Sequence, residues 1–121
     1  MATILLVEDD PAVSQVIEQH LSDVGFDVLA QPDTMTALRC IGSEQKVDLL
    51  LVDLVMPTDQ PDGLTFAEVV RAQAPQLPVI FITGYYGFVA RSGKLPGRVL
   101  YKPIDLDVLT HEINNGLAPK A

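Results

Sequence analysis

Apolar runs of strand length recur along the chain, and polar residues follow most of them. Three runs, residues 4–7, 49–52 and 78–82, have no charged or hydrogen-bonding side chain, and two less uniform stretches cover 26–30 and 99–101. Strands that are apolar at successive positions belong in a sheet covered on both faces, because half-exposed strands would alternate with polar residues. The pattern therefore predicts five strands in a covered, parallel sheet.

Helical spacing of apolar residues marks the connections between these runs. Asp10 followed by Pro11 is a typical helix start, and Gly25 is a typical stop for the helix between them. A second helix is expected over 34–41, and a third ends before Pro75. The apolar residues that define the second helix, and are expected to point inward, are Met35, Leu38 and Ile41; those that mark the third are Phe66, Val69 and Val70.

The final helix has clear start and stop signals, whereas the stretch that precedes the fifth strand does not favour a helix. Asp105 is expected to cap the final helix and Asn115-Gly116 to end it. The stretch 84–97 contains four glycines and a proline, and each glycine costs about 1 kcal/mol in a helix relative to alanine. We expect at most a short or irregular fourth helix there. The inward residues of the final helix are Leu106, Leu109 and Ile113.

Strands and helices alternate from end to end, which implies right-handed crossovers between parallel strands. The predicted fold class is α/β: a doubly wound, five-stranded parallel sheet in a flavodoxin-like (βα)5 three-layer sandwich. A chain of 121 residues fits one domain with a two-sided core, so we expect a single domain over residues 1–121.

Charge and composition narrow the function. Sixteen acidic and eight basic residues give a net charge of −8, and Lys and Arg form no run, so nothing indicates a nucleic-acid partner. No apolar run approaches the ~20 residues that span a bilayer, so we expect no membrane partner and a cytoplasmic location. The lone Cys40 excludes an internal disulfide and is expected to be a buried helix residue. His20 and His111 are expected to be surface residues rather than ligands or catalysts.

Acidic residues follow two of the buried runs. Glu8 and Asp9 come after the first, and Asp53 comes directly after the run at 49–52. If these strands lie side by side, their carboxylates meet at the carboxyl edge of the sheet, where open α/β sheets bind ligands. Crowded carboxylates resist ionisation unless a cation joins them, and oxygen ligands suit Mg²⁺. Taken alone, these acids could equally well solvate loops.

Two further polar residues extend this pattern. Thr83 follows the fourth run and Lys102 follows the fifth. In isolation, an ordinary strand end and a surface lysine would be the simpler interpretations. Together with a metal held by Asp9 and Asp53, however, a hydroxyl and an ammonium would surround a phosphoryl group and balance its charge. The combination predicts phosphoryl transfer onto Asp53, acting as a carboxylate nucleophile.

With these residues in place, the chain resembles a receiver domain of two-component response regulators over nearly its whole length. The matching stretches are LLVEDD, LVDLVMP, DG, ITG and YKP, at 5–10, 51–57, 62–63, 82–84 and 101–103. The resemblance implies a phosphorelay module that receives its phosphoryl group from a sensor histidine kinase or a histidine phosphotransfer protein. Its contacts with a downstream protein would then change. It implies no enzymatic activity beyond the module's own phosphorylation and dephosphorylation.

The same resemblance implies the metal ligands and the phosphoacceptor. Asp53 would accept the phosphoryl group and also bind Mg²⁺. Asp9 would be a direct ligand, Glu8 a ligand through water, and the carbonyl of Val55 a further ligand. The loop between 57 and 62 is longer than the family usually has, so we expect it to bulge on the metal side.

On the other side of Asp53, the resemblance implies that Thr83 hydrogen-bonds the phosphoryl group and that Lys102 pairs with it. A cis peptide between Lys102 and Pro103 would fix the direction of the lysine. Many receivers carry an aromatic switch residue three positions before the lysine, where this chain has Val99. The residues that could substitute for that aromatic are Tyr85, Tyr86 and Tyr101.

Two departures from the family bear on context and lifetime. The stretch 83–102 is shorter than usual, as in receivers attached to hybrid sensor kinases, so the chain fits a stand-alone receiver or a segment of a longer protein. Val55 and Tyr85 are bulky and cannot orient an attacking water, which predicts slow self-dephosphorylation.

Three other functions compete with this interpretation. A Mg²⁺-dependent phosphatase or phosphotransferase could use the same charges, but enzymes of the haloacid dehalogenase type carry an acid where this chain has Val55. A degenerate receiver could act by binding alone. A flavodoxin-like cofactor binder would need a phosphate loop after the first strand, where the acids from Glu8 to Asp10 would repel an anion.

Overall fold

The computed structural model describes residues 1–43, 46–57, 59–85 and 95–119. Its order of elements is the predicted alternation of strands and helices. The strands are β1 (Thr3–Val7), β2 (Asp27–Gln31), β3 (Leu49–Asp53), β4 (Val79–Thr83) and β5 (Arg98–Tyr101). The helices are α1 (Pro11–Asp23), α2 (Thr34–Gly42), α3 (Gly63–Gln73) and α5 (Leu106–Leu117).

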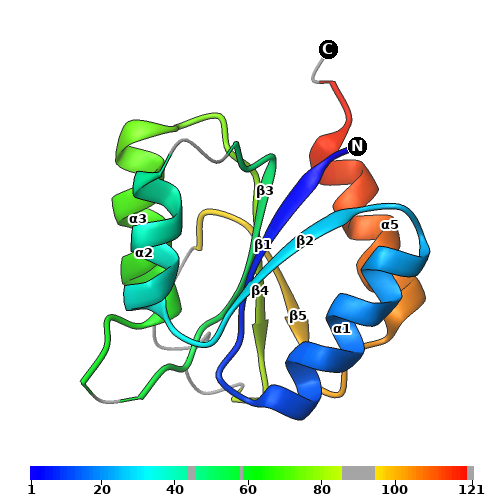
Figure 1. The fold of residues 1–121 in the computed structure, drawn as a ribbon, viewed down its shortest axis with the longest axis horizontal. Coiled ribbons are helices and arrows are strands. Elements are labelled where there is room, and N and C mark those ends of the chain that lie inside the picture. Colours follow the sequence, from blue (N-terminus) through cyan, green and yellow to red (C-terminus); the bar gives the residue numbers. More distant parts are fainter. Residues whose placement is uncertain (44–45, 58, 86–94, 120–121) are drawn as a thin grey trace.

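The five strands form one parallel sheet in the order β2-β1-β3-β4-β5. Helices α2 and α3 cover one face, and α1 and α5 cover the other (Figure 1). The predicted flavodoxin-like fold class is therefore confirmed. The irregular fourth helix was predicted for a stretch that mostly lies outside the described residues. Of the described helices, none is long and apolar enough to cross a membrane.

Side chains alternate between two apolar cores, one on each face of the sheet. The core under α2 and α3 contains Leu5, Leu50 and Phe81, whereas the core under α1 and α5 contains Ile4, Leu51 and Ile82. Both sets are fully buried, which is why strands β1, β3 and β4 have no polar face. The uniform apolar runs in the sequence arise from this two-sided burial.

The helix ends follow the chemistry that the sequence indicated. The Asp10 side chain accepts hydrogen bonds from the amides of Ala12 and Val13 at the start of α1. At its other end Gly25 adopts a φ of 102°, and the amides of Gly25 and Phe26 donate back into the last turn. This is the Schellman arrangement, in which glycine is favoured because a Cβ disfavours positive φ.

Several details of the predicted packing were wrong. Met35 is 43% exposed, because Thr34 and Ala37 occupy the buried face of α2 instead. The third helix forms as predicted; it packs through Phe66 and Val70, and Val69 is exposed. Helix α5 continues through Gly116 to Leu117 rather than ending at Asn115-Gly116. A Cβ at Gly116 would lie only 3.1 Å from a methyl group of Leu49, so this glycine serves close packing.

The predictions for the single cysteine and the two histidines have different outcomes. Cys40 is half-buried against the core under α2 and α3. His111 is exposed as predicted, but His20 is half-buried, and its Nε2 lies 2.8 Å from Oγ1 of Thr110. Because that hydroxyl donates to the carbonyl of Leu106, it accepts from His20. His20 therefore links α1 to α5.

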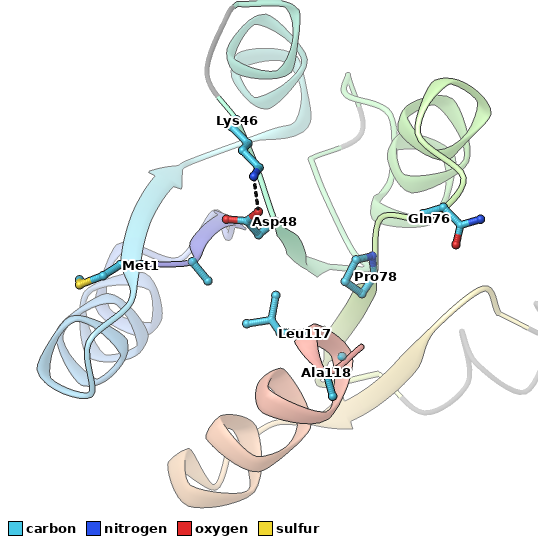
Figure 2. A pocket seen from close by; sticks show the side chains of 9 residues that line it. Met1, Lys46, Asp48, Gln76, Pro78, Leu117 and Ala118 are labelled. Carbon is cyan, nitrogen blue, oxygen red and sulfur yellow. Dashed lines mark ion pairs between the residues drawn. The ribbon is translucent and has the colours of Figure 1, made fainter. Parts of the chain in front are cut away.

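The amino edge of the sheet carries a hollow of about 620 Å³ between the start of β1 and the end of α5 (Figure 2). The ion pair Lys46–Asp48, 3.7 Å apart, lies on its rim. Within the described parts of the chain, the only cluster of three or more potential metal-ligating side chains lies elsewhere, at the carboxyl edge. The chemistry of the molecule is therefore expected at the carboxyl edge.

Candidate functional site

The strand order explains where the polar residues gather. The chain leaves β1 toward β2 on one side and returns as β3 on the other, so the carboxyl end between β1 and β3 is a topological switch point. Val7 lies beside Val52 in the register, so the next residues, Glu8 and Asp53, come together. Asp53 in turn lies beside Ile82 on β4. Three neighbouring strands thus deliver their ends to one place.

Three carboxylates meet at this switch point. Glu8, Asp9 and Asp53 each offer an oxygen within 4.8 Å of the others. Glu8 is 1% exposed and Asp53 4%, whereas Asp9 is exposed to solvent. Burial raises the pKa of Glu8 to about 7, and the charge of Asp53 adds to the effect against the opposing contacts of Lys102 and the Asp10 amide.

Lys102 is the counter-charge within this cluster. Its Nζ lies 2.8 Å from Oδ2 of Asp53 and 2.8 Å from Oε1 of Glu8. Burial by itself would lower the pKa of Lys102, but the contacts with Asp53 and Glu8 outweigh it, so the pKa is raised. The peptide bond between Lys102 and Pro103 is cis, as predicted. A single ammonium is therefore shared by two buried acids.

The backbone around Asp53 orients its carboxylate. Oδ1 accepts a hydrogen bond of 3.0 Å from the amide of Val55, while Oδ2 faces Lys102. Gly63 lies directly against the backbone of Asp53, and a Cβ there would be 2.1 Å from the carbonyl oxygen of Asp53. Its amide donates to the carbonyl of Leu54 at 3.0 Å. The loop that follows Asp53 is thus closed at its base.

Thr83 ends β4 on the side of Asp53 that faces β5. It is fully buried, and its hydroxyl accepts a hydrogen bond of 3.0 Å from the amide of Tyr85. Its carbonyl accepts from the amide of Lys102 at 2.8 Å. Thr83 and Lys102 are therefore fixed to one another through the backbone.

The donor set fits a hard divalent cation. Glu8 Oε1 is buried, and among the described residues its polar contact is the ammonium of Lys102, 2.8 Å away. Glu8 Oε2 already accepts from the amide of Asp10. Three carboxylates against one ammonium leave negative charge uncompensated, which a cation with oxygen ligands would neutralise. The residues that could hold it are Glu8, Asp9 and Asp53.

Most of the predicted site residues lie together, whereas the predicted residues that flank them differ in exposure. Val55 is 45% exposed and contacts Asp53 through its amide. Tyr85 is 46% exposed, and Val99 packs against the core under α2 and α3. Tyr86, one of the suggested substitutes for the aromatic switch, lies outside the described residues.

Sequence reasoning missed two residues, Thr34 and Gln60, that join α2 to the loop after Asp53. The hydroxyl of Thr34 donates to the carbonyl of Pro61 at 2.7 Å, and the amide of Met35 donates to Oε1 of Gln60 at 3.1 Å. Both contacts tie the loop between β3 and α3 to the start of α2. The one available signal was the length of that loop, because hydropathy places Thr34 only at a helix start.

A doubly wound parallel sheet in this strand order, with acids and a lysine at its switch point, places the chain in the class of flavodoxin-like domains. Comparison with known proteins gives the family. The family profile described as the response regulator receiver domain matches residues 4–114. The chain belongs to this family and is a receiver domain of two-component phosphorelay signalling.

Known relatives agree with this assignment. The transcriptional regulatory protein GlrR of Escherichia coli is 35% identical over 99% of this chain, which covers 27% of GlrR. A response regulator receiver protein from Sinorhizobium medicae is 28% identical with a TM-score of 0.87, covering 96% of this chain and 94% of that one. The receiver domain of the hybrid histidine kinase CckA is 32% identical, with a TM-score of 0.81 and coverage of 97% and 100%. The chain thus spans about a quarter of the length of GlrR.

Proposed function

We propose that Asp53 accepts a phosphoryl group from a phosphohistidine of a partner kinase or phosphotransfer protein. One observation carries this proposal: the buried carboxylate of Asp53 has one oxygen on the Val55 amide and the other on Lys102, beside two further acids. Receiver domains bind Mg²⁺, and this acidic cluster supports the same use here. Asp9 would bind the ion directly, Glu8 through water, and Asp53 and the carbonyl of Val55 would complete the protein's ligands.

The transfer is a displacement at phosphorus. An oxygen of Asp53 attacks the phosphorus atom, the bond between phosphorus and the histidine nitrogen breaks, and the electron pair leaves with the imidazole of the partner. Bound Mg²⁺ would neutralise charge on the phosphoryl oxygens. Before attack, Lys102 holds Oδ2 of Asp53 through their 2.8 Å contact.

The groups around Asp53 would then stabilise the product. Lys102 would pair with a phosphoryl oxygen, because its ammonium already lies at the carboxylate that becomes the acyl phosphate. The hydroxyl of Thr83 would donate a hydrogen bond to another oxygen. A movement of the hydroxyl toward the phosphoryl group would shift the acceptor of the Tyr85 amide, which donates to this hydroxyl before phosphorylation. This supports a change at the β4 end as the signal that a downstream protein reads.

The module would act in the cytoplasm and would turn over no external substrate. Val55 stands where phosphatases with an aspartyl intermediate carry a second acid, so the chain lacks their general acid–base. The output partner remains a protein in this proposal, because the net charge of −8 disfavours direct contact with nucleic acid.

The proposal is tested by intact mass after incubation with Mg²⁺ and acetyl phosphate. We expect one phosphoryl group on the wild-type protein and none on Asp53→Asn. The matched control is Asp59→Asn, the same change at an exposed acid of the neighbouring loop, which should be phosphorylated like the wild type. Chelation of Mg²⁺ with EDTA should abolish the adduct. No adduct at saturating Mg²⁺ would favour a receiver that acts by binding alone.

A further inference from the structure

The loop between β3 and α3 is fastened to the start of α2 by two hydrogen bonds, which we call the α2 clamp. In the first, the hydroxyl of Thr34 donates to the carbonyl of Pro61 at 2.7 Å. In the second, the amide of Met35 donates to Oε1 of Gln60 at 3.1 Å. The two bonds join segments that are more than twenty residues apart in the sequence. They therefore depend on the tertiary fold.

Both bonds satisfy groups that would otherwise lack a partner at the start of a helix. The first amides of a helix have no acceptor within it, and the Asp33 side chain accepts from the amide of Thr36. Gln60 supplies the acceptor for Met35 from outside the helix. Thr34 is fully buried, so its hydroxyl would carry a desolvation penalty without the carbonyl of Pro61. Each of the two hydrogen bonds of the clamp therefore satisfies a polar group at the start of α2.

The clamped loop also carries the residue beside the phosphoacceptor. It begins at Asp53 and Val55, joined by the bond between the Val55 amide and Oδ1. It ends at Gly63, whose amide donates to Leu54 at its base. The loop runs out from the carboxyl edge of the sheet and returns to α3 (Figure 1). Within the loop, the amide of Gln60 donates to the carbonyl of Pro57 at 3.0 Å, which connects the clamp to the part of the loop that includes Val55.

We propose that Thr34 and Gln60 are positioning residues for the metal site, which rests on the function proposed above. By fastening the loop to α2, they hold Val55 in the arrangement from which its carbonyl serves the cation. The observation behind the proposal is that Gln60 and Pro61, both in the loop that follows Asp53, contact the start of α2 through hydrogen bonds of 3.1 and 2.7 Å.

The size of the effect follows from the population of the clamped loop. Apparent affinity falls in proportion to the fraction of molecules in the binding-competent arrangement. A hydrogen bond of ordinary net strength changes the ratio of clamped to released loop by about two-fold to ten-fold, which is the upper limit of the change in the clamped fraction. We therefore expect Thr34→Val to weaken Mg²⁺ binding by at most about ten-fold, without abolishing it.

The test is a titration of the metal-free protein with MgCl₂, in which the shifts of the amide cross-peaks in NMR spectra report Mg²⁺ binding. Thr34→Val removes the hydroxyl at nearly constant volume. Thr34→Ser retains it and should restore affinity. Thr36→Val is the matched control, because Thr36 is on the same helix and its hydroxyl contacts only the Asp33 carbonyl. Gln60→Ala tests the second bond independently, at a half-buried position where misfolding is not expected.

The outcomes separate the clamp from the proposed function. Weaker Mg²⁺ binding by Thr34→Val and Gln60→Ala, with Thr34→Ser and Thr36→Val like the wild type, would support the clamp. Unchanged Mg²⁺ affinity in both clamp variants, even with a lower melting temperature in EDTA, would reduce Thr34 and Gln60 to structural residues and overturn it. Failure of the wild type itself to bind Mg²⁺ would overturn the proposed function and the clamp with it. This outcome is seen in the wild-type titration, before any variant is compared.

Discussion

Replacement of Gly63 by alanine should be one of the most damaging small changes in this chain. The added Cβ would lie 2.1 Å from the carbonyl oxygen of Asp53 and 2.9 Å from both the Asp53 carbonyl carbon and the Cα of Leu54. All three are backbone atoms at the end of β3, which is held between β1 and β4. Because that strand end cannot yield, α3 must move away.

The magnitude follows from what this movement breaks. Displacing α3 sacrifices the 3.0 Å bond from the Gly63 amide to Leu54, about 1 kcal/mol. Overpacking against a fixed neighbour adds about 1–3 kcal/mol. Loss of glycine's freedom in the unfolded chain returns about 0.4–1 kcal/mol. We expect a net loss of about 1–3.5 kcal/mol in the free energy of unfolding, a large part of the ~5–15 kcal/mol of a typical domain.

Urea denaturation followed by far-UV circular dichroism measures this loss. The matched control is Gly42→Ala in α2, where an added Cβ meets no atom within 4 Å. That variant should gain up to about 1 kcal/mol, because alanine is the better helix residue. If Gly63→Ala were as stable as Gly42→Ala, the close packing of α3 beneath Asp53 would be refuted.

Three further predictions concern the site and the core. In EDTA, the free energy of unfolding of the wild type should fall as the pH rises from about 4.5 to 7. Native Glu8, with a pKa of about 7, keeps a proton over this range, whereas its pKa in the unfolded chain has the ordinary value of 4.5. The urea midpoint of Glu8→Gln should not show this fall. Once phosphorylated, the wild type should release phosphate more slowly than Val55→Asn or Tyr85→His, whose polar side chains can orient water; equal rates would count against the proposed shielding. Phe81→Ala should cost about 3–5 kcal/mol in urea denaturation, because Phe81 is fully buried in the middle of β4; a loss below about 1 kcal/mol would contradict that burial.

The sheet and most of its site could be predicted from the sequence for one physical reason. Strands buried on both faces must be apolar throughout, so the polar residue that ends each run is conspicuous: Glu8, Asp53, Thr83 and Lys102. Parallel order then places those ends at one edge. The sequence does not carry the distances, such as the equal 2.8 Å contacts of Lys102 with Glu8 and Asp53.

The errors came from contacts between distant segments. In α2, hydropathy favours Met35 as an inward residue, yet the fully buried position belongs to Thr34. A hydroxyl is tolerated there only because the carbonyl of Pro61, 27 residues away, accepts its hydrogen bond. Likewise, Gly116 reads as a helix stop, but its missing side chain serves packing against Leu49 and Pro78. No local pattern encodes either partner.

The central claim is that the phosphoryl group resides on Asp53, and chemical reduction followed by peptide mapping tests it most directly. Borohydride converts an aspartyl phosphate to homoserine, so the site of modification becomes a permanent change of residue. After incubation with Mg²⁺ and acetyl phosphate, we expect homoserine at position 53 and nowhere else. Homoserine at Asp9 instead, or none in a protein whose intact mass shows a phosphoryl group, would contradict the assignment.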